Sequence, residues 1–428
     1  QEKREELFEE FEIRDAFPPD VRAEAEARTE DVQAEIEAEL DDRTDRRDLT
    51  TWTTDPVDAQ DFDDALSIQE DEETYTLWVH IADVSHYVHP DSEMWTEAIE
   101  RGNTVYLPGY TVHMLPPILA ETVCSLVPEE DRLAHTVEME VSKETLSFES
   151  VDIYKSVIHS DERLTYTQCE NRLEDPDAPL HAENSLVYEL AEQLHEQRKA
   201  DGSLVLNPSR DRAHTIIEEC MLKANKAVTH ELMWNRGVEA MYRVHPQPTP
   251  DQWDDALREI NDLNGVNLSG ASWDDPRKAV NDALENSEKR ALNKIQRAVL
   301  KVMPRAKYMN DPFGGHYALN FDIYGHFTSP IRRLSRPTAR RTARPPNAST
   351  SSSSRRSAST PTRSTTAASS PSTTTAPSST RRGCRPSGST AGSSCHRGTR
   401  YCLCVKSRTS PSWVVTQRSN SMLSSRLL

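Results

Sequence analysis

The chain has 428 residues and carries 50 Lys and Arg against 70 Asp and Glu, a formal net charge of −20. Residues 336–428 contain 15 Arg, one Lys and no Asp or Glu, which leaves 34 basic and 70 acidic residues, a net charge of −36, in residues 1–335. Such a body repels nucleic acid at low salt unless basic groups gather in one groove or the working salt screens the repulsion. With no membrane-length apolar run and no signal peptide, we expect a cytoplasmic protein with no membrane partner, from a halophile-like cell.

Residues 1–48 are strongly charged and helix-prone, and two segments show an apolar stripe, Lys3–Phe11 and Val32–Leu40. We expect these helices to pack on the body that follows rather than to form an independent domain. A strand-rich stretch then runs to about residue 158, with strands expected at Tyr75–Ser85, Thr104–Pro108 and His135–Val141. Helices dominate afterwards, most clearly at Ala213–Trp234 and Asn293–Met303.

Four carboxylates lie between the lead-in and the first strands, Asp55, Asp61, Asp63 and Asp64, in the spacing D-x5-D-x-D-D. Apolar Phe62 interrupts the run, which a purely solvating acidic segment does not require. Carboxylates on one short loop beside a buried strand suit a hard divalent cation and therefore phosphoryl chemistry. Two other interpretations stay open, a solvated acidic face and a DxDD proton donor as in some terpene cyclases.

Two further groups of possible ligands are weaker. His80, His86 and His89 lie near Asp83, but strand-borne histidines are usually structural, and Asp83 is more simply a hydrogen-bond acceptor. Single cysteines in the body predict reduced, buried thiols, namely Cys124, Cys169 and Cys220. The cysteines near the C-terminus do not have the spacing of a paired-knuckle zinc site: Cys384, Cys395, His396, Cys402 and Cys404.

The composition changes abruptly after Ser335, where Ser, Thr, Arg, Ala and Pro replace the acidic, periodic sequence. Low hydrophobicity with charge of one sign predicts disorder. In GC-rich DNA, GAC and GAG codons that are translated out of frame yield Thr, Ser and Arg, so we expect a frameshift near residues 334–336. An Arg-rich RNA-binding tail is the competing interpretation.

Eight separated blocks of the sequence belong together: Asp55–Ser67, His80–Ser85, Tyr106–Pro108, Met114–Pro117, Cys124–Leu126, Asp131–Leu133, Ile217–Met221 and His326–Arg333. In order and rough spacing they resemble the RNB catalytic domain of the ribonuclease II/R family, and the resemblance spans residues 49–335. It is nearest to the compact, acidic archaeal ribonuclease R-like members.

The resemblance implies an α+β domain with a sheet-rich metal half and helices that wall an RNA channel. It implies a monomeric hydrolase that degrades single-stranded RNA from 3′ to 5′ and releases nucleoside 5′-monophosphates. Mg²⁺, with Mn²⁺ as the alternative, would be held by the four aspartates in a two-metal mechanism, and no organic cofactor is expected.

The resemblance also gives roles to single residues. Asp63 and Asp64 match the positions most essential to catalysis, and Arg332 matches the arginine that clamps the scissile phosphate. Contacts to RNA are implied for Tyr106, Glu218, Glu219, Arg332 and Arg333, with Glu218 or Glu219 at the ribose 2′-hydroxyl. From the residues alone, Tyr106 is equally a core strand tyrosine, and the two glutamates are equally exposed helix acids.

The chain departs from the family pattern at both ends. Residues 1–48 cannot hold two cold-shock-type domains, and the helix expected after Arg333 is replaced by Leu334–Pro337. We therefore expect a charged helical lead-in at 1–48, a catalytic domain at 49–335 that is incomplete at its C-terminus, and a low-complexity tail at 336–428. The rival to an active nuclease is an inactive RNA-binding remnant or an unstable truncated product of the same family.

The acid excess makes a prediction about salt. Because residues 1–335 repel one another at a net charge of −36, the folded fraction should rise with KCl into the molar range, where the Debye length falls to about 3 Å. Circular dichroism against KCl concentration measures this. A fold that is equally stable in dilute buffer would refute the halophile-like interpretation.

Overall fold

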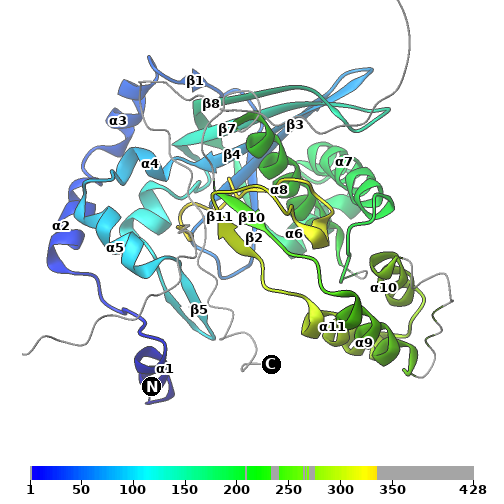
Figure 1. The fold of residues 1–428 in the computed structure, drawn as a ribbon. Coiled ribbons are helices and arrows are strands. Elements are labelled where there is room, and N and C mark those ends of the chain that lie inside the picture. The colour runs from blue at the N-terminus through cyan, green and yellow to red at the C-terminus, as the bar shows by residue number, and fades with distance from the viewer. Residues whose placement is uncertain are drawn as a thin grey trace, which may run out of the picture. The chain divides into compact units, whose positions relative to one another are not determined.

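The computed structural model describes residues 2–207, 210–232, 241–263, 266, 268 and 275–334 (Figure 1). The predicted disordered tail, the out-of-frame sequence and the C-terminal cysteines concern residues outside this set. Within the described residues, no helix is both long and apolar enough to span a membrane.

A seven-stranded mixed sheet has the order β1-β8-β7-β4-β3-β2-β9. Its inner pairs are antiparallel, whereas β1 pairs with β8 and β9 with β2 in parallel. The strands are β1 (Thr44–Asp45), β2 (Trp52–Asp55), β3 (Asp64–Glu70), β4 (Thr74–Ala82), β7 (Glu130–Ser142), β8 (Phe148–Ser160) and β9 (Glu162–Thr165). Two-stranded sheets are formed by β5 (Val105–Leu107) with β6 (Tyr110–Val112) and by β10 (Tyr242–Val244) with β11 (Lys307–Met309). The α+β prediction is confirmed.

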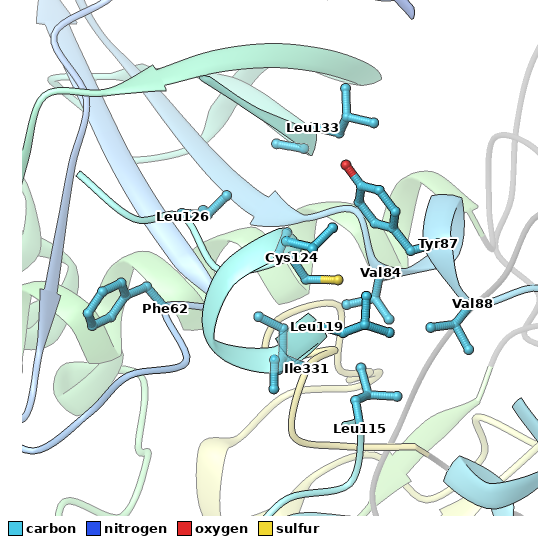
Figure 2. Packing of buried hydrophobic residues seen from close by; sticks show 14 of the residues in the cluster. Phe62, Val84, Tyr87, Val88, Leu115, Leu119, Cys124, Leu126, Leu133 and Ile331 are labelled. Atoms are coloured by element: carbon cyan, nitrogen blue, oxygen red, sulfur yellow. The ribbon is translucent and has the colours of Figure 1, made fainter. Parts of the chain in front are cut away.

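Helices cover the sheet through two hydrophobic clusters. Alternate residues of β3, β4 and β7 pack against α7 (His181–Ala200) and α8 (Arg212–His230). The second cluster joins α2 (Pro19–Ala27), α3 (Val32–Glu39) and α5 (Glu93–Arg101) to the π-helical turn Leu119–Val123. Figure 2 shows Leu119 of this turn and Cys124, which follows it, close to Ile331 and Val84. The described cysteines are free and buried, as predicted.

A third cluster holds α9 (Pro250–Asn261), α10 (Pro276–Glu285) and α11 (Lys289–Val302) together. The remaining described elements are α1 (Glu2–Glu10), α4 (Val84–Tyr87), α6 (Tyr166–Glu174) and the 3-10 turn Tyr317–Leu319.

The strand that was expected to reach Ser85 ends at Ala82, and this is a correction to the sequence analysis. Asp83 instead caps α4, because its carboxylate accepts hydrogen bonds from the His86 amide at 3.1 Å and the Ser85 hydroxyl at 2.6 Å. Hydrogen bonds from these two local donors to the Asp83 carboxylate stabilise the start of a helix, so the strand does not continue past Ala82. Asp83 is thus the structural acceptor that the sequence suggested.

Asp83 also connects the lead-in helices to the body. The fully buried Arg43, just after α3, places its Nη2 2.8 Å from Asp83 Oδ2. His86 reaches back to Glu35 of α3 at 2.9 Å. Breaking a buried pair leaves an uncompensated charge, so this contact keeps α3 attached to the body.

A buried polar chain crosses the sheet through His80. The Thr51 and Ser67 hydroxyls lie 2.7 Å apart, and Ser67 lies 3.1 Å from His80 Nε2. On the other side, His80 Nδ1 lies 2.7 Å from the Thr136 hydroxyl, which lies 2.6 Å from Ser156. Because both ring nitrogens have partners inside the sheet, His80 is a structural residue and not a metal ligand.

The burial of His80 in this series of hydrogen bonds predicts that the stability of the protein depends on pH. Burial lowers the pKa of His80 to about 3, whereas the unfolded residue titrates near about 6.5. Between these two pKa values, His80 is protonated in the unfolded protein and neutral in the folded protein. The free energy of unfolding should therefore fall as the pH drops from about 6.5 toward 3, by at most about 1.4 kcal/mol per pH unit for this group. Denaturant unfolding in KCl at several pH values should show a shallower slope for His80→Gln. His89→Gln, at the surface, is the control, and equal slopes for all three proteins would contradict the prediction.

Candidate active site

The aspartate loop joins two strands of the sheet. Asp55 is the last residue of β2 and Asp64 is the first residue of β3. Between them Phe62 is buried in the cluster of Figure 2, its amide donates to the Ser125 hydroxyl at 2.9 Å, and its carbonyl accepts from the Leu126 amide at 2.9 Å. The apolar interruption seen in the sequence is therefore the anchor that holds the acidic loop against the core.

A cavity of about 830 Å³ opens over this loop. Most of the predicted site residues line it together: Asp55, Asp61, Asp63, Asp64, Tyr106 and Arg332. Tyr166 of α6 and Ile217 of α8 line the same cavity, so helices on the sheet border it on one side.

The carboxylates in the cavity are electrostatically unfavourable. Burial, and then the neighbouring Asp64, raise the pKa of Asp55 to about 8. Burial likewise raises the pKa of Asp63 to about 7, although Arg332 opposes the shift, and burial raises the pKa of Asp64. Carboxylates whose charged forms are this disfavoured need a positive partner to stay ionised near neutral pH.

Asp63 receives its positive partner from the distant segment that ends at Arg332. Its Oδ1 accepts from the Ile331 amide at 2.7 Å and its Oδ2 from Arg332 Nε at 3.2 Å. The guanidinium also donates to the Ser329 hydroxyl at 2.9 Å, and its side chain stays 36% exposed. Arg332 is therefore held at the cavity wall with part of its surface free to meet an anion.

Asn225 of α8 fixes the same segment from the other side, and the sequence analysis did not find it. Its buried side-chain oxygen accepts from the Phe327 amide at 2.6 Å and the Thr328 amide at 3.2 Å. Its amide nitrogen lies 3.2 Å from the Tyr324 hydroxyl. The available signal was a polar residue among the mostly apolar buried positions of this helix.

Two aromatic residues face the cavity. Tyr106 is 52% exposed as a residue, and its hydroxyl donates to Asp61 Oδ2 at 2.8 Å, so it is not a core strand tyrosine. Tyr166, which the sequence analysis also missed, stacks on His214 with the ring centroids 3.8 Å apart.

The remaining predicted residues do not line this cavity. Glu219 is only 3% exposed and accepts from Arg198 Nε at 3.1 Å, with His195 at 2.9 Å. Glu218 forms an ion pair with Arg210. Arg333 pairs in a β-bridge with Asn103, and burial lowers its pKa. Contacts of these three residues with RNA remain predictions.

The donor set suits a hard cation. Among the residues the structure describes, no three His, Cys, Asp or Glu side chains converge closely enough to hold a metal ion unaided. However, Asp55 Oδ2 is buried without a hydrogen-bond partner, and the mutual repulsion of Asp55 and Asp64 is what a divalent cation would relieve. Mg²⁺ commonly takes one or two carboxylates and fills its shell with water and phosphate oxygens. The cavity therefore fits such an ion.

Residues 43–335 match the model of the RNB domain. The chain belongs to the RNB domain family. It is 35% identical to ribonuclease R of Aquifex aeolicus over 354 residues, which cover 76% of this chain and 49% of that protein. The predicted kinship with ribonuclease R is confirmed, while the archaeal subgroup stays a prediction.

Solved structures agree on the RNB domain. Mycoplasma genitalium ribonuclease R in complex with ribose-methylated single-stranded RNA matches with a TM-score of 0.66 and 26% identity, over 75% of this chain and 53% of that one. Yeast Ssd1, described as a pseudonuclease, matches with a TM-score of 0.60 and 24% identity, over 69% of this chain and 39% of that one. The fold is thus shared by a ribonuclease R and a pseudonuclease. The chain spans about half the length of the curated relatives it matches.

Proposed function

We propose that this chain is a hydrolytic 3′→5′ exoribonuclease that releases nucleoside 5′-monophosphates from single-stranded RNA. One observation carries the proposal: a cavity that belongs to an RNB domain brings buried carboxylates with an unpartnered oxygen together with a guanidinium fixed by Asp63. A degraded version of this site would be expected to lose one of these charges, and Asp55, Asp61, Asp63, Asp64 and Arg332 are all present.

The residues divide the work in a simple way. Asp55, Asp61 and Asp64 would hold Mg²⁺ or Mn²⁺. When bound, such an ion would supply a water of lowered pKa and would offset negative charge on the phosphate. Arg332 donates to the scissile phosphate as charge grows on its oxygens, since Asp63 fixes the guanidinium in advance. The exposed ring of Tyr106 stacks on a base, which is independent of sequence and suits a degradative enzyme.

A net-acidic body also needs a place where RNA can approach. Residues 289–307 contain seven exposed basic residues and no Asp or Glu: Lys289, Arg290, Lys294, Arg297, Lys301, Arg305 and Lys307. Arg290 and Lys301 pair with Glu288 and Glu259, whereas no ion pair within the described residues engages Lys294, Arg297, Arg305 or Lys307. We propose that this basic face on α11 and the residues after it attracts the RNA backbone.

The proposed domain division keeps residues 49–335 as the catalytic domain with the lead-in packed on it. The rival function is an RNA-binding protein without hydrolysis, and the match to a pseudonuclease is the observation that favours testing it.

Labelled RNA distinguishes the two functions. In molar KCl with Mg²⁺, the purified chain should shorten 5′-labelled single-stranded RNA progressively. It should release the label of 3′-labelled RNA at once as a nucleoside monophosphate. Asp63→Asn should bind RNA but lose most hydrolysis, because Arg332 loses its anionic partner. Asp58→Asn, an exposed residue of the same loop, is the matched control. RNA that binds and stays full length with the unaltered chain would establish the rival.

The basic face makes a separate prediction. Lys294→Glu with Arg297→Glu should weaken binding of single-stranded RNA and flatten its salt dependence by about 0.7 per lost phosphate contact. Arg258→Glu serves as the control, because this residue is on neighbouring α9 beside Asp254 and Asp255. Fluorescence anisotropy at several KCl concentrations gives the slopes, and an unchanged slope in the double variant would remove α11 from the RNA path.

A further inference from the structure

The four aspartates differ in what orients them. Both oxygens of Asp63 accept from nitrogen donors, and one of these donors is the Arg332 guanidinium, which compensates the charge. Asp61 is held differently: of the described residues, only Tyr106 donates a hydrogen bond to its side chain, at 2.8 Å. A phenol is a neutral donor, so it orients the carboxylate and leaves its full negative charge available.

The tyrosine is itself well placed. Tyr106 is the middle residue of β5, paired with Thr111 of β6. At the base of this hairpin the Thr104 amide donates to the Arg332 carbonyl at 3.0 Å, and the Thr104 hydroxyl accepts from the Met114 amide at 3.0 Å. The hairpin is therefore hydrogen-bonded to the segment that carries the guanidinium, and its tyrosine reaches across to the acidic loop.

We propose that the Tyr106 hydroxyl is a positioning group for Asp61, which it turns so that the second carboxylate oxygen points at the cation. This rests on the proposed function and deepens it. One side chain then acts twice, because its ring meets the terminal base while its hydroxyl sets a metal ligand. A base that moves the ring would move Asp61 as well, so correct seating of the RNA end and assembly of the metal shell are coupled.

Tyr106→Phe tests the hydroxyl alone, since phenylalanine keeps the ring that stacks. Mn²⁺ binding without RNA, followed by electron paramagnetic resonance in high KCl, should weaken about tenfold, the scale of a hydrogen bond to a charged group. Single-stranded RNA affinity measured in EDTA should stay unchanged. Asp55→Asn gives the background of Mn²⁺ held by the acidic surface, and circular dichroism confirms that each variant folds.

The same hairpin offers a matched control. The Tyr110 hydroxyl donates to Asp15 at 2.6 Å, outside the aspartate loop. Tyr110→Phe should therefore leave Mn²⁺ binding unchanged. If Tyr110→Phe weakens Mn²⁺ binding as much as Tyr106→Phe does, the effect is general loosening of the hairpin and the proposal fails.

Other results also decide the matter. Mn²⁺ binding by Tyr106→Phe equal to that of the unaltered chain would overturn the proposal, and so would an unaltered chain that binds no more Mn²⁺ than Asp55→Asn. If only the proposed function fails, the unaltered chain would bind Mn²⁺ above background and leave RNA intact. The comparison of Mn²⁺ binding by Tyr106→Phe and Tyr110→Phe would still show whether the Tyr106 hydroxyl positions Asp61. In an active enzyme, Tyr106→Phe should raise the Mg²⁺ concentration for half-maximal turnover without raising KM for RNA.

Discussion

Repulsion among buried carboxylates is the constraint on which the rest of this structure depends. Burial raises the pKa values of Asp55 and Asp63 to about 8 and about 7, so the site opposes its own ionisation. A flexible loop would relieve this by moving apart. Here two paired strands fix the ends of the loop, Phe62 fixes its middle, and one carboxylate is compensated from within by Arg332. Asp55 and Asp64 still repel each other, and a divalent cation between them would relieve this repulsion.

The parts of the site that sequence predicts are those whose evidence is local. The spacing of the four aspartates, the interrupting Phe62 and the segment before Arg332 can all be found by inspection, and the structure brings them into one cavity. Asn225 and Tyr166 could not be found this way, because their importance lies in contacts with residues more than forty positions away. Glu218 and Glu219 were predicted to be site residues, but neither lines the cavity. Neighbouring residues of a helix point in different directions, and the sequence alone does not say which direction faces the cavity.

The fold was predictable to a similar depth. Apolar alternation identified β4 and β7 and helical spacing identified α8, because an apolar face of each packs in the same core cluster. The end of β4 was misplaced by three residues, since the capping bonds of Asp83 depend on the geometry of its carboxylate and not on apolar alternation. The net charge of residues 1–335 did not indicate where basic residues gather. A body of net charge −36 still contains a nineteen-residue stretch, 289–307, without a single acid.

The contact between Asp63 and Ile331 joins residues that are 268 positions apart. A ribosome makes the aspartate loop first and reaches Ile331 only 268 residues after Asp63. Until that segment emerges, the cavity lacks its guanidinium, and Asp63 has neither of its nitrogen donors. The site therefore stays incomplete until the ribosome has made and released the segment that carries Ile331 and Arg332, so a shorter nascent chain has the aspartates but not the Asp63–Arg332 contact.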